Sequence, residues 1–417
     1  MANVSSSNGL EKRPKLRFPD FDESYKDTTL GEIASLVNRT DPKSDAPIMM
    51  LSAGNGFIMQ SEKYSRDNAG QSLKKYILLK KGELAYNHGA SKAKQYGCCY
   101  ELTENEARIP YVYHCFKVCE TEYTPYIAIA LNNTKMDNQL KRLVSSSVRM
   151  DGLLNISFED YMSITMSLPS SEEQKHIADF FSKLDERIKA QERLVSSLKK
   201  YKRGVTRRLF AQEKGSFETN LQIVSLGDLF PFIRNGFVGT VTPFFTDREH
   251  GVRYLQGTNI HAGKITDDTV YYVTKDFNAK HSKNILKRDD ILVVQSGHVG
   301  ECAVVGKEYE GANCHALIIM SNGGNCFSDY VAQYINSEAG NKQIASITTG
   351  NTIRHILASA IADMVIPIPS LEEQKRVAYL LSIYDDRIAK EEQLLSELEA
   401  MRKGLLPVSY THLTLPT

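Results

Sequence analysis

The chain has almost no net charge, which limits what its overall composition can say about partners. It carries 51 Lys and Arg residues against 50 Asp and Glu residues, a formal net charge of +1. Binding to nucleic acid would therefore have to come from local basic surface and not from the field of the whole chain. No apolar run approaches the roughly 20 residues that a bilayer-spanning helix needs, and the polar start is unlike a secretion signal. We expect a soluble, cytoplasmic protein with no membrane partner.

The cysteines lack the pattern of a disulfide framework or a zinc knuckle. They are seven in number and none forms a CxxC pair, which indicates a reducing compartment. His114-Cys115 with Cys119, and Cys314-His315, show neither a complete metal-ligand set nor a base partner for a nucleophile. We interpret them as buried structural residues.

Motifs for methyl transfer or ATP use are also missing. Pro-Pro does not occur, so the Asn/Asp-Pro-Pro-aromatic pocket of base methylation is absent. The string at 300–307 that most resembles a phosphate loop has one residue too many between its glycines, and Glu308 stands in place of Ser or Thr. We predict no catalytic residue, no metal site and no cofactor bound by this chain. A self-contained nuclease or methyltransferase is disfavoured.

One phrase occurs twice, at positions 169–175 and 369–375. The first copy reads Pro-Ser-Ser-Glu-Glu-Gln-Lys and the second Pro-Ser-Leu-Glu-Glu-Gln-Lys. Pro-Ser followed by carboxylates is typical of a helix start, because acidic groups complement the exposed backbone N–H groups. The register of the repeat holds through Gly204 and Gly404. The sequence therefore predicts two related long helices in a pseudo-two-fold molecule.

Both predicted helices carry a narrow apolar seam. Apolar residues recur in steps of four and three over about four heptads, which is typical of a coiled coil and not of a helix lying on a sheet. The predicted helix-pairing residues are Ile177, Phe181, Leu184, Ile188, Val195 and Leu198 in the first helix, and Val377, Leu381, Tyr384, Ile388, Leu395 and Leu398 in the second.

The charges of the two helices differ in sign. The first is rich in Lys and Arg and the second in Asp and Glu, which favours pairing of one with the other over self-association. The globular segment between them allows this pair to be antiparallel. Such a pair would separate two globular parts by roughly 50 to 60 Å at 1.5 Å per residue. Periodicity alone agrees equally well with a helical hairpin that merely ties two domains together.

The globular segments resemble each other more weakly than the helices do. Leu-Gly-Glu-Ile at 30–33 is similar to Leu-Gly-Asp-Leu at 226–229, and both segments contain short β-rich runs punctuated by Gly and Asn. We predict two mixed α/β domains and an antiparallel coiled coil. The predicted boundaries are a first domain at 1–168, a central helix at 169–213, a second domain at 214–367, a C-terminal helix at 368–406 and a tail at 407–417.

The predicted tail interrupts the repeat. Pro407 should end the second helix. The peptide that follows can be encoded by a nucleotide sequence resembling a transposon end used in sequencing libraries, so we interpret the tail as non-native.

The repeated phrase resembles one in the specificity subunit of type I restriction-modification systems. In that family each of two target-recognition domains is followed by a helix that opens with Ile-Pro-x-Pro-x-x-x-Glu-Gln. Here positions 366–374 read Ile-Pro-Ile-Pro-Ser-Leu-Glu-Glu-Gln, and positions 166–174 read Met-Ser-Leu-Pro-Ser-Ser-Glu-Glu-Gln. Leu-Arg-Phe-Pro-Asp-Phe at 16–21 is also similar to the family's start, although Tyr25 stands where a Trp is usual. The resemblance covers nearly the whole chain except the tail.

This resemblance implies a division of labour. Each target-recognition domain would read one half of a split double-stranded DNA target, and the paired helices would fix the gap and dock two methylation subunits. Restriction/translocase subunits would join the same core. The resemblance implies S-adenosylmethionine, ATP and Mg²⁺ for the partner subunits only.

Each domain offers loop residues of the types that read base edges or hold phosphates. In the first domain the DNA-binding candidates follow a predicted strand, and in the second they occupy the matching place and a later loop. They are Tyr86, Asn87, His88, Ser91, Lys92 and Lys94 in the first domain, and Gln295, Ser296, His298, Thr349, Asn351, Thr352 and Arg354 in the second. The same residue types would also serve a solvated turn, or helix capping at Asn351 or Thr352.

Two classes of function remain, a DNA-reading adaptor and a coiled-coil scaffold that binds only protein. The loops differ between domains that otherwise look related, and reading two different half-sites would demand such a difference. The sequence therefore favours the adaptor.

Overall fold

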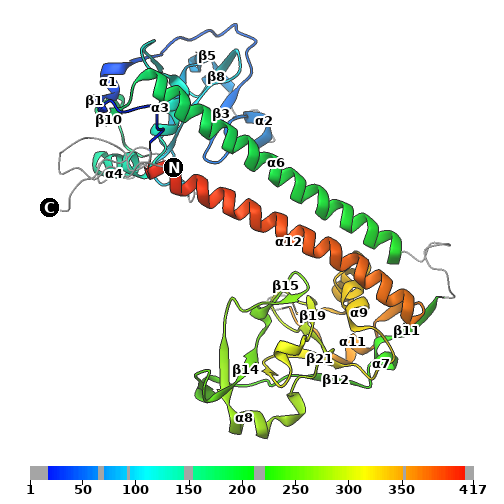
Figure 1. Cartoon of the computed structure of the whole chain (residues 1–417). Helices are drawn as coiled ribbons and strands as arrows, with labels where there is room; N and C mark the ends of the chain where they lie inside the picture. The colour runs from blue at the N-terminus through cyan, green and yellow to red at the C-terminus, as the bar shows by residue number, and fades with distance from the viewer. Residues whose placement is uncertain are drawn as a thin grey trace. The chain divides into compact units, whose positions relative to one another are not determined.

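The computed structural model describes residues 17–63, 70–91, 94–144, 154–210, 221–350 and 354–408. The chain divides into two compact units, residues 1–190 with 394–417, and residues 191–393. Each unit contains one globular domain and parts of two long helices, α6 (Ser171–Phe210) and α12 (Leu371–Val408). Figure 1 shows the elements of each unit.

The globular domain of the first unit is mixed α/β and built on short strands. The strands are β1 (Lys26–Thr29), β2 (Ala34–Leu36), β3 (Met49–Ser52), β4 (Gly56–Met59), β5 (Ile77–Lys80), β6 (Leu84–Asn87), β7 (Cys98–Glu101), β8 (Glu106–Ile109), β9 (His114–Val118) and β10 (Thr165–Leu168). The helices are α1 (Leu30–Ile33), α2 (Gln60–Lys63), the 3₁₀ helix η1 (Gly70–Lys75), α3 (Thr124–Ala130), α4 (Thr134–Leu143) and α5 (Phe158–Met162). Four strands form an antiparallel sheet in the order β2-β9-β6-β7, beside the pairs β1-β10, β3-β4 and β5-β8.

The second unit repeats this plan with additions. Its strands are β11 (Gln222–Ser225), β12 (Phe232–Asn235), β13 (Phe245–Thr246), β14 (Gly251–Leu255), β15 (Ile260–His261), β16 (Lys264–Ile265), β17 (Tyr271–Thr274), β18 (Ile291–Val294), β19 (Cys302–Val304), β20 (Asn313–Cys314), β21 (Leu317–Ser321) and β22 (Val365–Ile368). Its α-helices are α7 (Leu226–Leu229), α8 (Lys275–Lys280), α9 (Ser328–Ile335), α10 (Glu338–Ile347) and α11 (Ala358–Ala362). Its 3₁₀ helices are η2 (Thr242–Phe244), η3 (Gly257–Asn259), η4 (Ser282–Asn284) and η5 (Lys307–Tyr309).

The two domains share one strand order. The sheet β12-β21-β18-β19 is antiparallel and matches β2-β9-β6-β7, and the pair β11-β22 matches β1-β10. The second domain adds a sheet in the order β13-β17-β14-β20 and the hairpin β15-β16. The prediction that one mixed α/β unit is used twice, each time followed by a long helix, is confirmed.

The buried strands explain why the sheets form where they do. All four residues of β18 are buried, as are the first three of β6. A short apolar run bounded by glycine and polar residues is typical of a strand that is covered on both faces. The ends of these strands, where polar residues begin, therefore mark where the chain can approach a ligand.

Each long helix begins at the repeated phrase and is held there by a buried glutamine. Gln174 Oε1 accepts the N–H of Tyr123 at 2.9 Å, and Gln374 Oε1 accepts the N–H of Phe327 at 2.8 Å. The side-chain amide of each donates to the carbonyl oxygen of the proline five residues earlier, at 3.0 Å in both copies. The repeated glutamine thus fixes the first turn of each helix to the start of α3 or α9.

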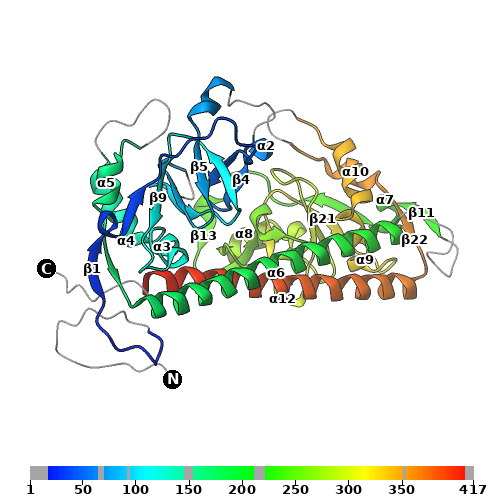
Figure 2. The ribbon, with the colours of Figure 1, turned by 90° about the horizontal axis from the view of Figure 1, so that it is seen from above.

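Parts of α6 and α12 lie against each other within each unit (Figure 1, Figure 2). In the first unit, the guanidinium of Arg402 pairs with Asp185, with Nη2 3.0 Å from Oδ2. In the second unit, Lys202 Nζ lies 2.5 Å from Asp385 Oδ1. The two contacts join equivalent positions of the repeat with the helices exchanged. Within the second unit, Gln191 contacts Glu391 and Lys202 contacts Asp385, so α6 and α12 are antiparallel there. The same second unit holds the buried pair of Gln191 and Glu391, in which the amide donates to the carboxylate at 2.6 Å.

The predicted helix-pairing residues lie on buried or half-buried faces. Ile177 and Phe181 belong to the core of the first domain, where Leu405 of α12 also packs. Val377 and Leu381 belong to the core of the second domain, together with Phe210 of α6. Four of the remaining residues are buried, namely Leu184, Ile188, Val195 and Ile388. The other four are half-buried, namely Leu198, Tyr384, Leu395 and Leu398. Sequence periodicity alone did not indicate that the first turns of each helix serve a domain core as well.

The C-terminal helix runs past the proline that was expected to end it. Helix α12 ends at Val408, one residue beyond Pro407. The proline lies in the last turn, so the hydrogen bond lost with its N–H is at the end of the helix and no complete turn follows it. The rest of the predicted tail lies outside the described residues.

We expect Gln174→Ala to lower the free energy of unfolding by about 1–3 kcal/mol. The substitution leaves the Tyr123 N–H and the Pro169 carbonyl without the partner that satisfies them in a buried site. Urea unfolding followed by circular dichroism would measure the loss. Lys175→Ala, on the exposed neighbouring position, is the matched control and should change stability by no more than about 0.5 kcal/mol. Equal midpoints for the two variants would contradict the prediction.

Candidate nucleic-acid interface

The candidate loops follow equivalent strands in the two domains. In the first unit the loop begins at Asn87, the last residue of β6, and in the second it begins at Gln295, directly after β18. These strands occupy the same place in the two matching sheets. The sequence-based pairing of the two loops therefore has a structural counterpart.

Two of the predicted contacts in the first loop are core residues. Tyr86 is 1% exposed, its hydroxyl donates to the Tyr96 carbonyl at 2.7 Å, and its ring stacks on Tyr161. His88 is 5% exposed, with Nδ1 and Nε2 each 2.8 Å from a backbone carbonyl, those of Leu154 and Val112. Both were expected to face DNA, and the structure corrects this. They hold the base of the loop in place, because their polar atoms are already engaged inside the domain.

The other residues of the first loop are closer to solvent. Asn87 is half-buried and its Oδ1 accepts the Gly89 N–H at 2.9 Å, which shapes the turn. Ser91 is exposed, and its hydroxyl accepts the Lys94 N–H at 3.0 Å. Lys94 is half-buried and donates to the Asn132 carbonyl at 2.9 Å, and burial lowers the pKa of its ammonium group. Lys92 lies outside the described residues.

A further exposed pair, Tyr111 and Lys75, lies near this loop and was not predicted from the sequence. Tyr111 is 50% exposed, and the ammonium of Lys75 lies 5.8 Å from the centre of its ring. Tyr111 precedes Val112, whose carbonyl contacts His88. An aromatic ring and an ammonium group beside the loop are suited to sugar and phosphate contacts. These two residues are identified only by their exposure in the structure, because no motif surrounds them in the sequence.

In the second domain the structure brings the two predicted loops together. Ser296 is exposed and its hydroxyl lies 2.9 Å from His355 Nδ1. Thr349 and His355 exchange two backbone hydrogen bonds, both of 2.9 Å. The exposed Arg354 extends from the same segment. Ser296, Thr349 and Arg354 therefore form one polar surface, while Asn351 and Thr352 lie outside the described residues.

Gln295 is a supporting residue and not a surface contact. It is 3% exposed, and its amide donates to Asn235 Oδ1 at 3.1 Å and to the Ile356 carbonyl at 3.2 Å. The expectation that it reads DNA is corrected by this burial. Its hydrogen bonds join the ends of β12 and β18 to the segment after His355, which explains why the two loops meet.

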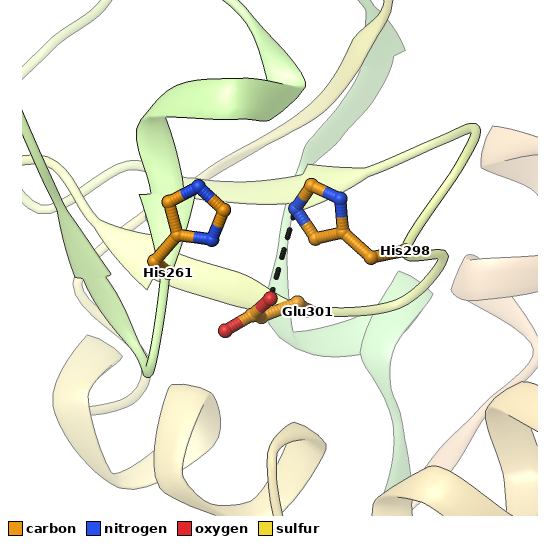
Figure 3. Close-up of side chains that lie close together, drawn as sticks. All are labelled: His261, His298 and Glu301. Atoms are coloured by element: carbon orange, nitrogen blue, oxygen red, sulfur yellow. Dashed lines mark ion pairs between the residues drawn. The ribbon is translucent and has the colours of Figure 1, made fainter. Parts of the chain in front are cut away.

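His298 is exposed but already has neighbours within the domain. Its Nε2 lies 3.0 Å from the Ile260 carbonyl and 3.6 Å from a carboxylate oxygen of Glu301. Together with His261 these side chains place three donor groups within 4.8 Å of one another (Figure 3). The sequence did not reveal this group, because His261 lies on a different hairpin with no ligand-like spacing to the other two.

The pairs of histidine and cysteine considered in the sequence contain buried thiols and one exposed thiol. Burial raises the pKa of both Cys115 and Cys314 to about 12, so these thiols stay protonated at neutral pH. Burial also lowers the pKa of His114 and of His315. Of the seven free cysteines, Cys119 is the exposed one. The interpretation as buried residues is confirmed for Cys115 and Cys314, whereas it is wrong for Cys119, which is exposed, and the two histidines are half-buried.

The second unit also contains a cavity of about 1210 Å³ between its domain and its helical segments. Lys199, Lys202, Arg354, Asp385 and Glu392 are among its lining residues. The ammonium groups are largely paired, since Lys199 lies 2.5 Å from Glu392 and Lys202 lies 2.5 Å from Asp385. The cavity is thus a mixed-charge space and not a concentrated anion site.

No helix in the described ranges is both long and apolar enough to cross a membrane.

The known proteins that this chain resembles in sequence and in structure all belong to one family. The family model of the type I restriction modification DNA specificity domain matches residues 218–400. The type I restriction enzyme MjaVIII specificity subunit of Methanocaldococcus jannaschii is 24% identical over 288 residues, which are 64% of this chain and 66% of that protein. The EcoKI specificity subunit of Escherichia coli is 28% identical over 180 residues, 38% of this chain and 37% of that protein. The matched stretches thus span about two thirds or less of these relatives.

Solved structures show the same fold. The S subunit of a type I restriction-modification system from M. genitalium superposes with a TM-score of 0.62 at 14% identity, covering 96% of this chain and 100% of the other. A structure from a study of complex assembly and conformational transition in a type I system superposes with a TM-score of 0.56 at 13% identity, covering 93% and 97%. These identities support a shared architecture and carry nothing about individual contacts.

We expect Gly300→Ala to destabilise the second unit more than Gly297→Ala. Both glycines have a positive φ, 90° and 88°, so either alanine incurs a backbone cost of about 1–2 kcal/mol. A Cβ at position 300 would also collide with Ile344, whereas a Cβ at position 297 meets nothing within 4 Å. The collision should add about 1–3 kcal/mol. Urea unfolding of the two variants would measure the difference, and equal losses would contradict the predicted clash.

Proposed function

We propose that this chain is the sequence-specific DNA-binding subunit of a type I restriction-modification complex, because it is similar to the specificity subunits of such systems. Each globular domain reads one half of a bipartite double-stranded target. The chain is not catalytic by itself. Methyl transfer and DNA cleavage belong to partner subunits, which also hold S-adenosylmethionine, ATP and Mg²⁺.

The observation that carries this proposal is the difference between two loops on one framework. The strands β6 and β18 occupy the same place in matching sheets. The loop after β6 presents Asn87 and Ser91, whereas the loop after β18 joins a second segment to present Ser296, Thr349 and Arg354. Amide, hydroxyl and guanidinium groups are those that distinguish base edges in the major groove. Two similar frameworks with unlike polar surfaces are what two different half-sites require.

The long helices supply the partner-binding part of the proposal. Phe180 on α6 and Leu380 on α12 hold equivalent positions of the repeat and are 40% and 39% exposed. Exposed apolar side chains at matching positions of the two units are suited to binding the same partner twice. We therefore propose that each unit binds one methylation subunit. Restriction/translocase subunits would then join the assembled core, and the continuous helices would set the spacing between the half-sites, as in the sequence-based prediction.

We expect Asn87→Ala to change recognition of one half-site and leave the other intact. A lost base contact costs about 1–3 kcal/mol of discrimination, or roughly 5- to 150-fold at that position. Methylome sequencing of cells expressing the chain with its partner methylation subunit would show the change. Arg354→Ala is the reciprocal control, since it should affect only the other half-site.

Two outcomes would count against this assignment. If either variant altered both half-sites together, the domains would not read DNA separately. If the assembled complex methylated no defined sequence, the alternative of a coiled-coil scaffold without DNA readout would replace the proposal.

We expect Ile383→Glu to weaken binding of a methylation subunit by about tenfold or more. Ile383 is 47% exposed beside Tyr379, which is 70% exposed, and a buried unpaired carboxylate is costly at an interface. Calorimetry with the purified subunit would measure affinity. Ala389→Glu makes the same change of charge at another exposed position of α12 and is the matched control. Equal affinities for the two variants would place the docking surface elsewhere.

A further inference from the structure

Two hairpins of the second unit bring three potential metal ligands to one place. His261 ends β15, and His298 and Glu301 lie in the loop between β18 and β19. One ligand atom from each side chain lies within 4.8 Å of the others. Figure 3 shows the two imidazoles facing each other above the carboxylate. Their rings are nearly parallel, with centroids 5.3 Å apart and an interplanar angle of 18°.

The backbone of both hairpins is shaped to hold this arrangement. The turn after His261 uses positive φ at Ala262 and Gly263, 51° and 77°. The loop after β18 turns at Gly297 and Gly300, and the Gly300 N–H donates to the Val294 carbonyl at 2.9 Å. A Cβ at Gly300 would collide with Ile344, so this turn has no room to shift inward. The three side chains are thus carried by constrained turns and not by a free surface loop.

Hydrogen bonds between the two hairpins also orient the side chains. The Glu301 carboxylate accepts the Ala262 N–H, which ties it to the turn beside His261. His298 Nε2 donates to the Ile260 carbonyl at 3.0 Å, which leaves Nδ1 as the nitrogen with a free lone pair. Histidines that bind metals commonly donate their other ring N–H to a carbonyl or carboxylate in this way. The hydrogen bonds therefore orient the cluster before any ion arrives.

The donor set selects the type of cation. Two imidazole nitrogens and one carboxylate oxygen are ligands that suit zinc and similar transition metals, whereas calcium and magnesium prefer oxygen ligands. Ligand atoms bound to one zinc ion at about 2.0–2.2 Å stand about 3.4 Å apart in a tetrahedral site. In the structure one ligand atom from each of the three side chains lies within 4.8 Å of the others, so small side-chain rotations would bring them to that spacing. The His261 ring makes no hydrogen bond to any described residue, so its nitrogens are available to an ion.

We propose that His261, His298 and Glu301 bind a divalent transition metal of the zinc class, which clips the 260–265 hairpin to the 295–301 loop. Three protein ligands leave a fourth position for water or another donor. The ion would stiffen the loop that also carries Ser296. Metal binding itself is independent of the DNA-reading function proposed above.

The test is metal binding by the untagged full-length chain after treatment with a chelator. Zn²⁺ affinity is measured by calorimetry, and Co²⁺ is used as a coloured probe whose visible absorption reports nitrogen and oxygen ligands. We expect one equivalent of metal per chain and a higher thermal midpoint when Zn²⁺ is present, because an ion that binds only the folded state stabilises it. His261→Gln and His298→Gln should each weaken binding by at least about tenfold.

A matched control separates this site from other histidines. His250 is exposed in the same unit and pairs with Asp247 at 2.8 Å, so His250→Gln should leave both the stoichiometry and the affinity unchanged. Glu301→Gln keeps an acceptor for the Ala262 N–H and removes the charge, so weaker binding at an unchanged metal-free midpoint supports the carboxylate as a ligand.

The proposal is overturned if the chain takes up no Zn²⁺ or Co²⁺ at micromolar concentrations. It is also overturned if His261→Gln and His298→Gln bind metal as tightly as the unmodified chain. In either case His298 and Glu301 are only a local pair, and His261 only stacks on His298. Circular dichroism of each metal-free variant confirms that a loss of binding is not a loss of folding.

Discussion

The hydrogen bonds of one repeated glutamine fix how each long helix leaves its domain. Gln174 and Gln374 are 0% and 2% exposed, and each satisfies a backbone N–H at the start of a neighbouring helix and the carbonyl of the proline that lies two residues before its own long helix. A buried amide with both ends engaged permits one orientation of the helix, because any rotation would leave polar groups unsatisfied. The glutamine makes the same contacts in both units, which explains why positions 169–175 and 369–375 are so similar in sequence.

The second constraint is the antiparallel match between the helices. Arg402 with Asp185 and Lys202 with Asp385 are the same interaction made twice with the helices exchanged. Partly exposed ion pairs contribute little free energy, so they act mainly by excluding other registers. The pair of Gln191 and Glu391 is buried, and its carboxylate also meets Arg387 at 2.7 Å. A buried polar pair of this kind specifies alignment more than it stabilises.

The large features of the fold could be predicted from sequence, and the surface of the candidate interface could not. The helices followed from a repeated phrase and from an apolar seam with steps of four and three over about four heptads, signals that few other structures produce. By contrast, Tyr86, His88 and Gln295 look like loop residues in the sequence because polar side chains follow an apolar run. Their burial depends on Leu154, Val112 and Ile356, which come from elsewhere in the chain. The group of His261, His298 and Glu301 was missed for the same reason, since hairpin packing and not spacing brings it together.

The uneven exposure of the cysteines has a practical consequence. Cys119 is exposed, whereas the other six are buried. A maleimide dye should therefore attach at a single natural position under native conditions. That position lies four residues before Tyr123, whose N–H is held by Gln174. A fluorophore there would report on the junction between domain and helix without any engineered cysteine.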